Sequence, residues 1–316
     1  MIRDSQPRVV LFSILLLGSF TILFALTSIG DVSSQANTSL PENKTFNVSI
    51  TNSPQSTFSN TETLENLGLS TVYRSVQQEI KQIMNLAYQS MNLTNSFGNF
   101  PLANITEDMQ QKYRGIPGEQ DTERRNEAKA LLANNPYLWF IGMTLPNGDT
   151  YFSEPFFSSQ ENSSKYNYGY RDHIIGALES KNPYLSNVIS SAATGQPIVV
   201  LASPIISGKD ANNTLIGVLA LGLNLSQFNE LLKTESVGKN NIRLLLLDNN
   251  GTKISDSQPT IIGQDSFNDL QSFKNAKNGK LGSMVENVDG KNMTISYAPL
   301  NFAQTKWILL SIATKS

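Results

Sequence analysis

Cysteine is absent from the 316 residues of the sequence, and His173 is the only histidine. Without cysteine the chain has no disulfide, no thiol nucleophile and no cysteine-ligated zinc or iron–sulfur cluster. A single histidine argues against multi-histidine metal sites and most histidine-based acid–base schemes. These absences remove most well-known enzyme classes, and we predict no metal or other cofactor.

Charged residues are also scarce. They make up 16% of the chain, below the ~25% usual in soluble domains, and asparagine, serine and threonine take their place. The formal net charge is −2, so no global basic field exists to hold nucleic acid. We therefore expect no nucleic-acid partner.

One long apolar run is present, Val9–Ile29, and it contains no charged residue. A transmembrane helix needs ~20 such residues, and Arg3 and Arg8 before the run predict a cytoplasmic N-terminus. A cleaved signal peptide is the alternative, because Ser34 and Ala36 offer small residues for cleavage, although the run exceeds the usual ~7–15 residues. We favour an uncleaved single-pass anchor in the cell membrane. Either interpretation places the rest of the chain outside the cytoplasm.

Asn-x-Ser/Thr sequons are frequent and fit that location, since they accept glycans where the machinery exists. Chance is the alternative explanation, because a chain rich in asparagine, serine and threonine produces sequons freely. We give most weight to the cluster between residues 37 and 47. The ten sequons begin at Asn37, Asn43, Asn47, Asn92, Asn104, Asn162, Asn212, Asn224, Asn250 and Asn292.

Hydrophobic spacing and turn residues divide the chain into segments. We expect a cytoplasmic N-terminus (1–8), the anchor (9–29), a flexible linker (30–60), a stalk helix with a membrane-distal module (61–225), and a membrane-proximal module (226–316). The distal part is predicted to contain helices over 61–92, 119–134 and 170–180, a loop-rich stretch over 95–118, and strands over 137–145, 150–153, 197–206 and 214–225.

The proximal part repeats this order with little repeated sequence. Its pattern predicts a helix over 226–235 capped by Ser226, strands over 242–247 and 252–255, a helix over 266–276, and strands over 281–288, 291–298 and 307–312. Strand, Asn-Gly-type turn, strand, helix and further strands therefore occur twice. The predicted fold class is α+β: two PAS-like antiparallel-sheet modules on a long N-terminal stalk helix, preceded by one transmembrane helix.

Several short motifs occur in a fixed order between residues 146 and 218: Pro146–Asp149, Arg171-Asp172-His173, Gly176-Ala177, Pro183–Ser186, Thr194-Gly195, Ser203–Ile205 and Gly217-Val218. Together they resemble the double Cache family of extracytoplasmic sensor domains, over residues 61 to 313. These domains belong to chemoreceptors, histidine kinases and cyclic-nucleotide enzymes. The resemblance implies a ligand pocket in the distal module, a proximal module that is usually empty, small-molecule ligands, and dimerisation through the stalk helix.

Arg171 is the first candidate for ligand binding under this resemblance. A guanidinium binds a carboxylate through two parallel hydrogen bonds, which lysine cannot reproduce. The alternative is a structural ion pair with Asp172 or another neighbouring carboxylate. Aromatic side chains offer the apolar walls and hydroxyl donors of small-ligand sites. The remaining candidates are Tyr166, Tyr168, Tyr184, His173, Trp139 and Asp172.

Three positions depart from the family's amino-acid-binding pattern. His173 stands where those proteins carry tryptophan, and it either binds the ligand or serves as a helix-start residue. Gly222 and Ser186 stand where carboxylates would hold the ligand's ammonium group. An unpaired ammonium in a pocket is costly. We therefore predict that the ligand is a small carboxylate, or a neutral or aromatic metabolite, and that α-amino acids do not bind in the usual way.

The sequence thus favours a sensor module that passes its signal to a separate partner protein. A solute-binding protein that serves a transporter is the alternative, and a cleaved signal peptide would favour it. An enzyme is the third possibility, through the carboxylates of Asp149, Glu154 and Asp172. Turn and cap roles explain these residues more simply, and no nucleophile elbow, P-loop or metal motif is present. We predict that the protein is not an enzyme.

Overall fold

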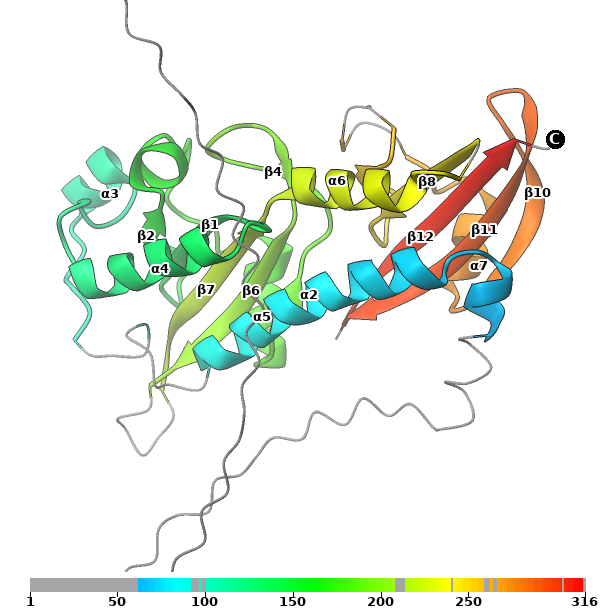
Figure 1. Cartoon of the computed structure of the whole chain (residues 1–316). Helices are drawn as coiled ribbons and strands as arrows, with labels where there is room; N and C mark the ends of the chain where they lie inside the picture. Colours follow the sequence, from blue (N-terminus) through cyan, green and yellow to red (C-terminus); the bar gives the residue numbers. More distant parts are fainter. Residues whose placement is uncertain are drawn as a thin grey trace, which may run out of the picture. The chain divides into compact units, whose positions relative to one another are not determined.

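Two antiparallel sheets of five strands each organise the protein in this computed structural model (Figure 1). The structure describes residues 62–91, 97, 101–207, 214–239, 241–258, 262–263, 266–302 and 304–314, all within one unit that spans residues 52–316. The predicted anchor (9–29) and linker (30–60) lie outside the described residues. Among the helices within these ranges, none has both the length and the apolar character needed to cross a bilayer.

The first sheet has the strand order β2-β1-β7-β6-β3. The predicted turn Pro146–Asp149 joins β1 to β2, and Gly148 supplies its positive φ of 87°. A separate two-stranded ribbon pairs β4 with β5. The strands are β1 (Leu138–Thr144), β2 (Thr150–Glu154), β3 (Tyr184–Leu185), β4 (Ile189–Ser190), β5 (Pro197–Ile198), β6 (Val200–Ile206) and β7 (Leu215–Leu223). We call residues 101–223 the first module.

The second sheet has the order β10-β11-β12-β8-β9. Read from its other edge, this order repeats the first sheet strand for strand, which confirms the predicted repeat of elements. We call residues 242–314 the second module. Its strands are β8 (Ile242–Leu247), β9 (Lys253–Asp256), β10 (Gly282–Val288), β11 (Lys291–Phe302) and β12 (Thr305–Thr314).

One amphipathic helix, α2, contacts both sheets through β6 and β11 (cyan in Figure 1). Val72, Val76, Ile80 and Ile83 are buried and recur at helical spacing, so they form its packed face. Helix α5 packs on the first sheet and α7 on the second. The helices are α2 (Ser70–Met91), α3 (Glu107–Tyr113), α4 (Thr122–Asn134), α5 (Asp172–Ser180), α6 (Leu225–Ser236) and α7 (Gln271–Lys277), with a π-helix, η2 (Phe156–Glu161).

Several predicted helix starts are wrong. The helix predicted over 61–92 is interrupted at residues 67–69, so α2 begins at Ser70, and the helix predicted from residue 119 begins at Thr122. Ser226 does not cap α6, because the helix begins one residue earlier, and the Ser226 hydroxyl instead donates to Asn224 Oδ1 at 2.7 Å. The helix predicted from residue 266 begins at Gln271, since Ser266 is held in a bridge to Thr252. The local sequence predicted the approximate position of each helix. Its first residue was determined by contacts with neighbouring residues, as for Ser226, or with a residue farther along the chain, as for Ser266.

Four elements were absent from the prediction: α3, η2 and the two-residue strands β3 and β4. The stretch predicted as loop-rich (95–118) contains α3, whose first turn is capped by the Thr106 side chain, which accepts from Met109 N at 3.2 Å. The π-helix η2 was assigned to no element. Both helices are short, so the hydrophobic period that reveals a longer helix has no room to develop.

Candidate functional site

A cavity of about 90 Å³ lies in the first module, on the side of the sheet that α5 covers. Its lining comes from β1, β2, β6 and β7, from the start of α5, from η2 and from the β4-β5 ribbon. The fold therefore brings together segments that lie far apart in the sequence. A space of this size takes a small metabolite or several water molecules.

Small residues at the centre of the sheet keep this space open. Gly142 on β1 pairs with Ala220 on β7, and Phe140 pairs with Gly222. A Cβ added at Gly222 would lie 2.1 Å from Phe140 Cδ1, so the phenyl ring already takes that room. Phe140 itself lines the cavity. The position where related amino-acid binders are expected to carry a carboxylate is therefore covered by an apolar ring.

The structure brings Trp139, Tyr168, Arg171 and His173 together in the lining of this cavity. Within the described residues, the other predicted side chains lie elsewhere. Tyr184 packs on α5, where a Cβ added at Gly176 would lie 2.3 Å from its ring. Tyr166 lines a separate, more open groove beside the β1–β2 turn. Asp172 contacts His173 at the helix start.

Arg171 reaches the cavity at the N-cap position of α5. Its Nη2 donates to the Ser190 carbonyl oxygen at 3.2 Å, and its guanidinium carbon lies 5.3 Å from the centre of the Tyr170 ring. In the part of the chain that the structure describes, no carboxylate lies within ion-pair distance of this guanidinium. The alternative of a structural ion pair with Asp172 is thus not seen, and Arg171 retains the capacity to bind an anion.

Sequence reasoning missed two further cations, Arg114 and Lys165, which also line the cavity. Arg114 Nε donates to the Ser163 carbonyl oxygen at 3.1 Å, and Lys165 Nζ lies 4.7 Å from the Tyr170 ring centre. No Asp or Glu occurs among the described residues that form the lining. The described lining of the cavity therefore carries three positive side chains and no acidic one.

His173 is a neutral, buried member of the lining. Only 5% of the residue is exposed, and this burial lowers the imidazole pKa, although the nearby Asp172 carboxylate opposes the shift. The two side chains are linked between Nδ1 and Oδ1 over 3.4 Å. The same hydrogen bond lowers the pKa of Asp172. At neutral pH His173 thus presents one donor and one acceptor nitrogen rather than a positive charge.

Ser186, the second position without the expected carboxylate, is completely buried and has a structural role. Its hydroxyl donates to the Asn187 carbonyl oxygen at 2.6 Å and accepts from Val200 N at 2.9 Å. The side chain is therefore occupied by backbone groups and is absent from the described cavity lining.

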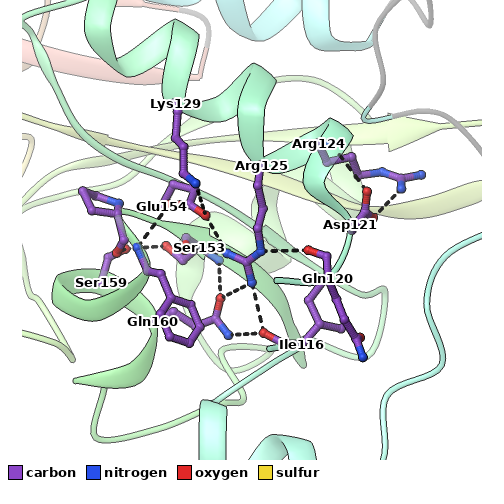
Figure 2. A network of polar contacts seen from close by, with 12 residues as sticks. Ile116, Gln120, Asp121, Arg124, Arg125, Lys129, Ser153, Glu154, Ser159 and Gln160 are labelled. Carbon is purple, nitrogen blue, oxygen red and sulfur yellow. Dashed lines mark hydrogen bonds and ion pairs between the residues drawn. The ribbon is translucent and has the colours of Figure 1, made fainter. Parts of the chain in front are cut away.

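Figure 2 shows a buried polar network, and its members Ser153, Ser159 and Gln160 also line the cavity. Arg125 is 1% exposed, and its Nη1 lies 2.6 Å from Glu154 Oε1. Its Nη2 donates to the Ile116 carbonyl oxygen at 3.0 Å and to Gln160 Oε1 at 3.1 Å. In Figure 2 the guanidinium lies at the centre of the network, with Gln120 on one side and Ser153 on the other.

Gln160 connects this network to the ligand cavity. It is fully buried on η2, donates to the Ile116 carbonyl oxygen at 2.8 Å, accepts from Ser153 N at 2.9 Å, and lines the cavity. The buried Arg125–Glu154 pair thus fixes the wall that β2 and η2 contribute. A buried ion pair is tolerated because each group has several hydrogen-bond partners.

Comparison with known proteins identifies the family to which this fold belongs. The model of the Cache domain family matches residues 56–316. The chain belongs to the Cache domain family. None of the curated protein sequences compared with this Cache protein matches it.

Solved structures share the fold at low sequence identity. An extracellular ligand binding receptor from Desulfohalobium retbaense aligns with a TM-score of 0.52 and 15% identity over 77% of this chain, which spans only 39% of that receptor. The ligand-binding domain of the Pseudomonas aeruginosa amino acid chemoreceptor PctC, in complex with GABA, aligns with a TM-score of 0.52 and 14% identity. The alignment covers 80% of this chain and 99% of the PctC domain. The ligand-binding domain of the Pseudomonas fluorescens chemoreceptor CtaA, in complex with L-serine, aligns with a TM-score of 0.54 and 14% identity. The alignment covers 81% of this chain and 98% of the CtaA domain.

Proposed function

We propose that this Cache protein is an extracytoplasmic sensor module that binds a small carboxylate in the cavity of its first module. The observation that carries the proposal is the charge of the lining: Arg114, Lys165 and Arg171 without an acidic residue among the described lining residues. A carboxylate accepts charge-assisted hydrogen bonds from such groups. Phe140 and Ala220 offer apolar contacts to the rest of a small ligand.

The same lining disfavours an α-amino acid. The related domains in complex with GABA and L-serine bind molecules that carry an ammonium group as well as a carboxylate. In this protein the Phe140 ring covers Gly222, and the Ser186 hydroxyl is hydrogen-bonded to backbone groups of Asn187 and Val200. An ammonium group in the cavity would therefore lose water without gaining a carboxylate partner, at a cost in free energy.

Four probes that share a three-carbon skeleton test this proposal: propionate, L-lactate, L-alanine and propylamine. We expect propionate or L-lactate to raise the melting temperature and to bind in isothermal titration, while L-alanine and propylamine do neither. Arg171→Ala should remove this stabilisation and leave the unliganded protein folded. Micromolar binding of L-alanine by the wild-type protein, or equal carboxylate binding by the variant, would contradict the proposal.

We also propose that the residues before the described structure anchor the module in the cell membrane and that it signals to a separate partner without catalysing a reaction. The uncharged run Val9–Ile29 supports the anchor. Sequencing the mature N-terminus distinguishes the two outcomes: an intact run supports the anchored sensor, and a mature chain beginning after Ala36 supports a transporter-linked binding protein. Conversion of a bound probe to a new compound would contradict the absence of catalysis.

A further inference from the structure

One wall of the ligand cavity extends to the second module. This wall segment, residues 184–198, runs from β3 through the β4-β5 ribbon. Its middle part, residues 189–194, lines the cavity, and its Ser190 carbonyl oxygen accepts the hydrogen bond from Arg171. Any shift of this segment therefore changes both the shape of the cavity and the position of its main candidate cation.

The first attachment of the wall segment is at Val188. Its backbone N–H donates to Oδ2 of Asp248 at 2.9 Å. Asp248 is 1% exposed and stands at the start of the β8–β9 turn, where its other oxygen, Oδ1, accepts from Asn250 N and Thr252 N, each at 2.8 Å. One buried carboxylate thus holds a turn of the second module with one oxygen and the cavity wall with the other.

The second attachment is at Leu185. Its carbonyl oxygen accepts from the hydroxyl of Thr305, the first residue of β12, at 2.6 Å. A third contact is steric: Gly263 lies so close to Pro197 that an added Cβ would come within 2.7 Å of its ring. The second module therefore forms hydrogen bonds with the wall segment before the cavity-lining residues 189–194 and is in steric contact with it after them.

We propose that Asp248 and Thr305 are positioning residues of the ligand cavity, through which the second module sets the position of the wall. A buried hydrogen bond to a carboxylate is among the stronger ones in proteins. Because linkage is reciprocal, a ligand that shifts the wall changes the stability of the Asp248 turn in return. The two modules then respond to binding as a coupled pair.

Hydrogen–deuterium exchange of the ligand-free protein tests this proposal. Asp248→Asn is a sharp probe, because the amide oxygen still serves the turn, while the amide nitrogen cannot accept from Val188 N. Thr305→Val removes the second bond without changing side-chain shape. We expect each variant to accelerate exchange of the backbone amides between residues 188 and 194 by about tenfold, with exchange in the first sheet unchanged.

Asp289→Asn is the matched control, because Asp289 is exposed in the β10–β11 turn and contacts neither attachment. It should leave exchange of the wall unaltered. Unchanged wall exchange in both test variants would overturn the proposal. If Asp248→Asn accelerates exchange throughout the second sheet, that variant has disturbed the β8–β9 turn itself. The Thr305→Val variant, in which this turn is unaltered, then provides the test. No ligand is present, so the result does not depend on the carboxylate proposed above.

Discussion

The two modules have the same strand order but fill the helix-covered face of the sheet differently. In the first sheet the central pairs are Gly142 with Ala220 and Phe140 with Gly222. In the second sheet the corresponding strands pair Leu245 with Leu310 and Leu247 with Ile308. These four aliphatic residues are buried in one cluster with Phe273 and Ala276 of α7.

This difference shows how one fold yields either a packed core or a binding site. Leucine and isoleucine fill the space between sheet and helix, whereas glycine and alanine leave it open. Strand order alone does not decide the outcome. The loops around the open space then supply charge, as Arg114, Lys165 and Arg171 do in the first module. Substitutions in each of the two modules test this difference in packing.

The largest expected effect comes from the polar support of the first module. Arg125→Ala leaves the carboxylate of Glu154 buried without its main partner, and should lower the free energy of unfolding by about 3–5 kcal/mol. Lys129→Ala is the matched control. Its ammonium lies 3.9 Å from the same carboxylate, but its side chain is 57% exposed, so we expect a change below about 1 kcal/mol. Chemical denaturation measures both, and equal losses would refute the distinction.

The next largest effect is expected in the second module. Leu310→Ala removes a fully buried side chain from the packed cluster and should cost about 2–5 kcal/mol. The same denaturation series measures it. If the loss is below 1 kcal/mol, this face of the second sheet is less tightly packed than the structure indicates, and the contrast between the modules weakens.

The converse change fills the first module. Ala220→Leu places a larger side chain in the cavity and should abolish the ligand-dependent stabilisation, which is about 2.7 kcal/mol at a hundredfold excess over Kd. The unliganded protein should change by less than about 1.5 kcal/mol, because existing space takes the side chain. Thermal shift with propionate and L-lactate measures this. Ala130→Leu on an exposed part of α4 is the control and should bind as the wild type does.

The smallest expected effect is a pH dependence confined to the first module, which contains the only histidine. Burial holds the pKa of His173 below its ordinary value of 6.5. Between the lowered pKa and 6.5 the unfolded state therefore binds more protons, so stability rises with pH and is lost as pH falls below about 6.5. His173→Gln should flatten this slope. An unchanged slope in melting temperature from about pH 5 to pH 7 would contradict it.

Much of the fold was predictable because its signals are local. The turn at Pro146–Asp149 and the apolar runs along the chain placed most strands within a few residues of their observed bounds. The candidate site was predictable only in part. Arg171 and His173 line the cavity together, and one short motif of the sequence contains both. Tyr184 and Tyr166 were selected by the same resemblance. Tyr184 packs on α5, and Tyr166 lines another groove.

The sequence by itself determined the α+β class, the repeated order of elements and the absence of cysteine-based chemistry, because periodicity and composition are properties of neighbouring residues. Only the tertiary structure decided which side chains share a cavity. Arg114 and Lys165 join Arg171 through loop packing, and Asp248 reaches Val188 from the other module. Such contacts join residues that lie far apart in the sequence, and they depend on how sheets and loops pack. Short-range sequence patterns therefore do not predict them.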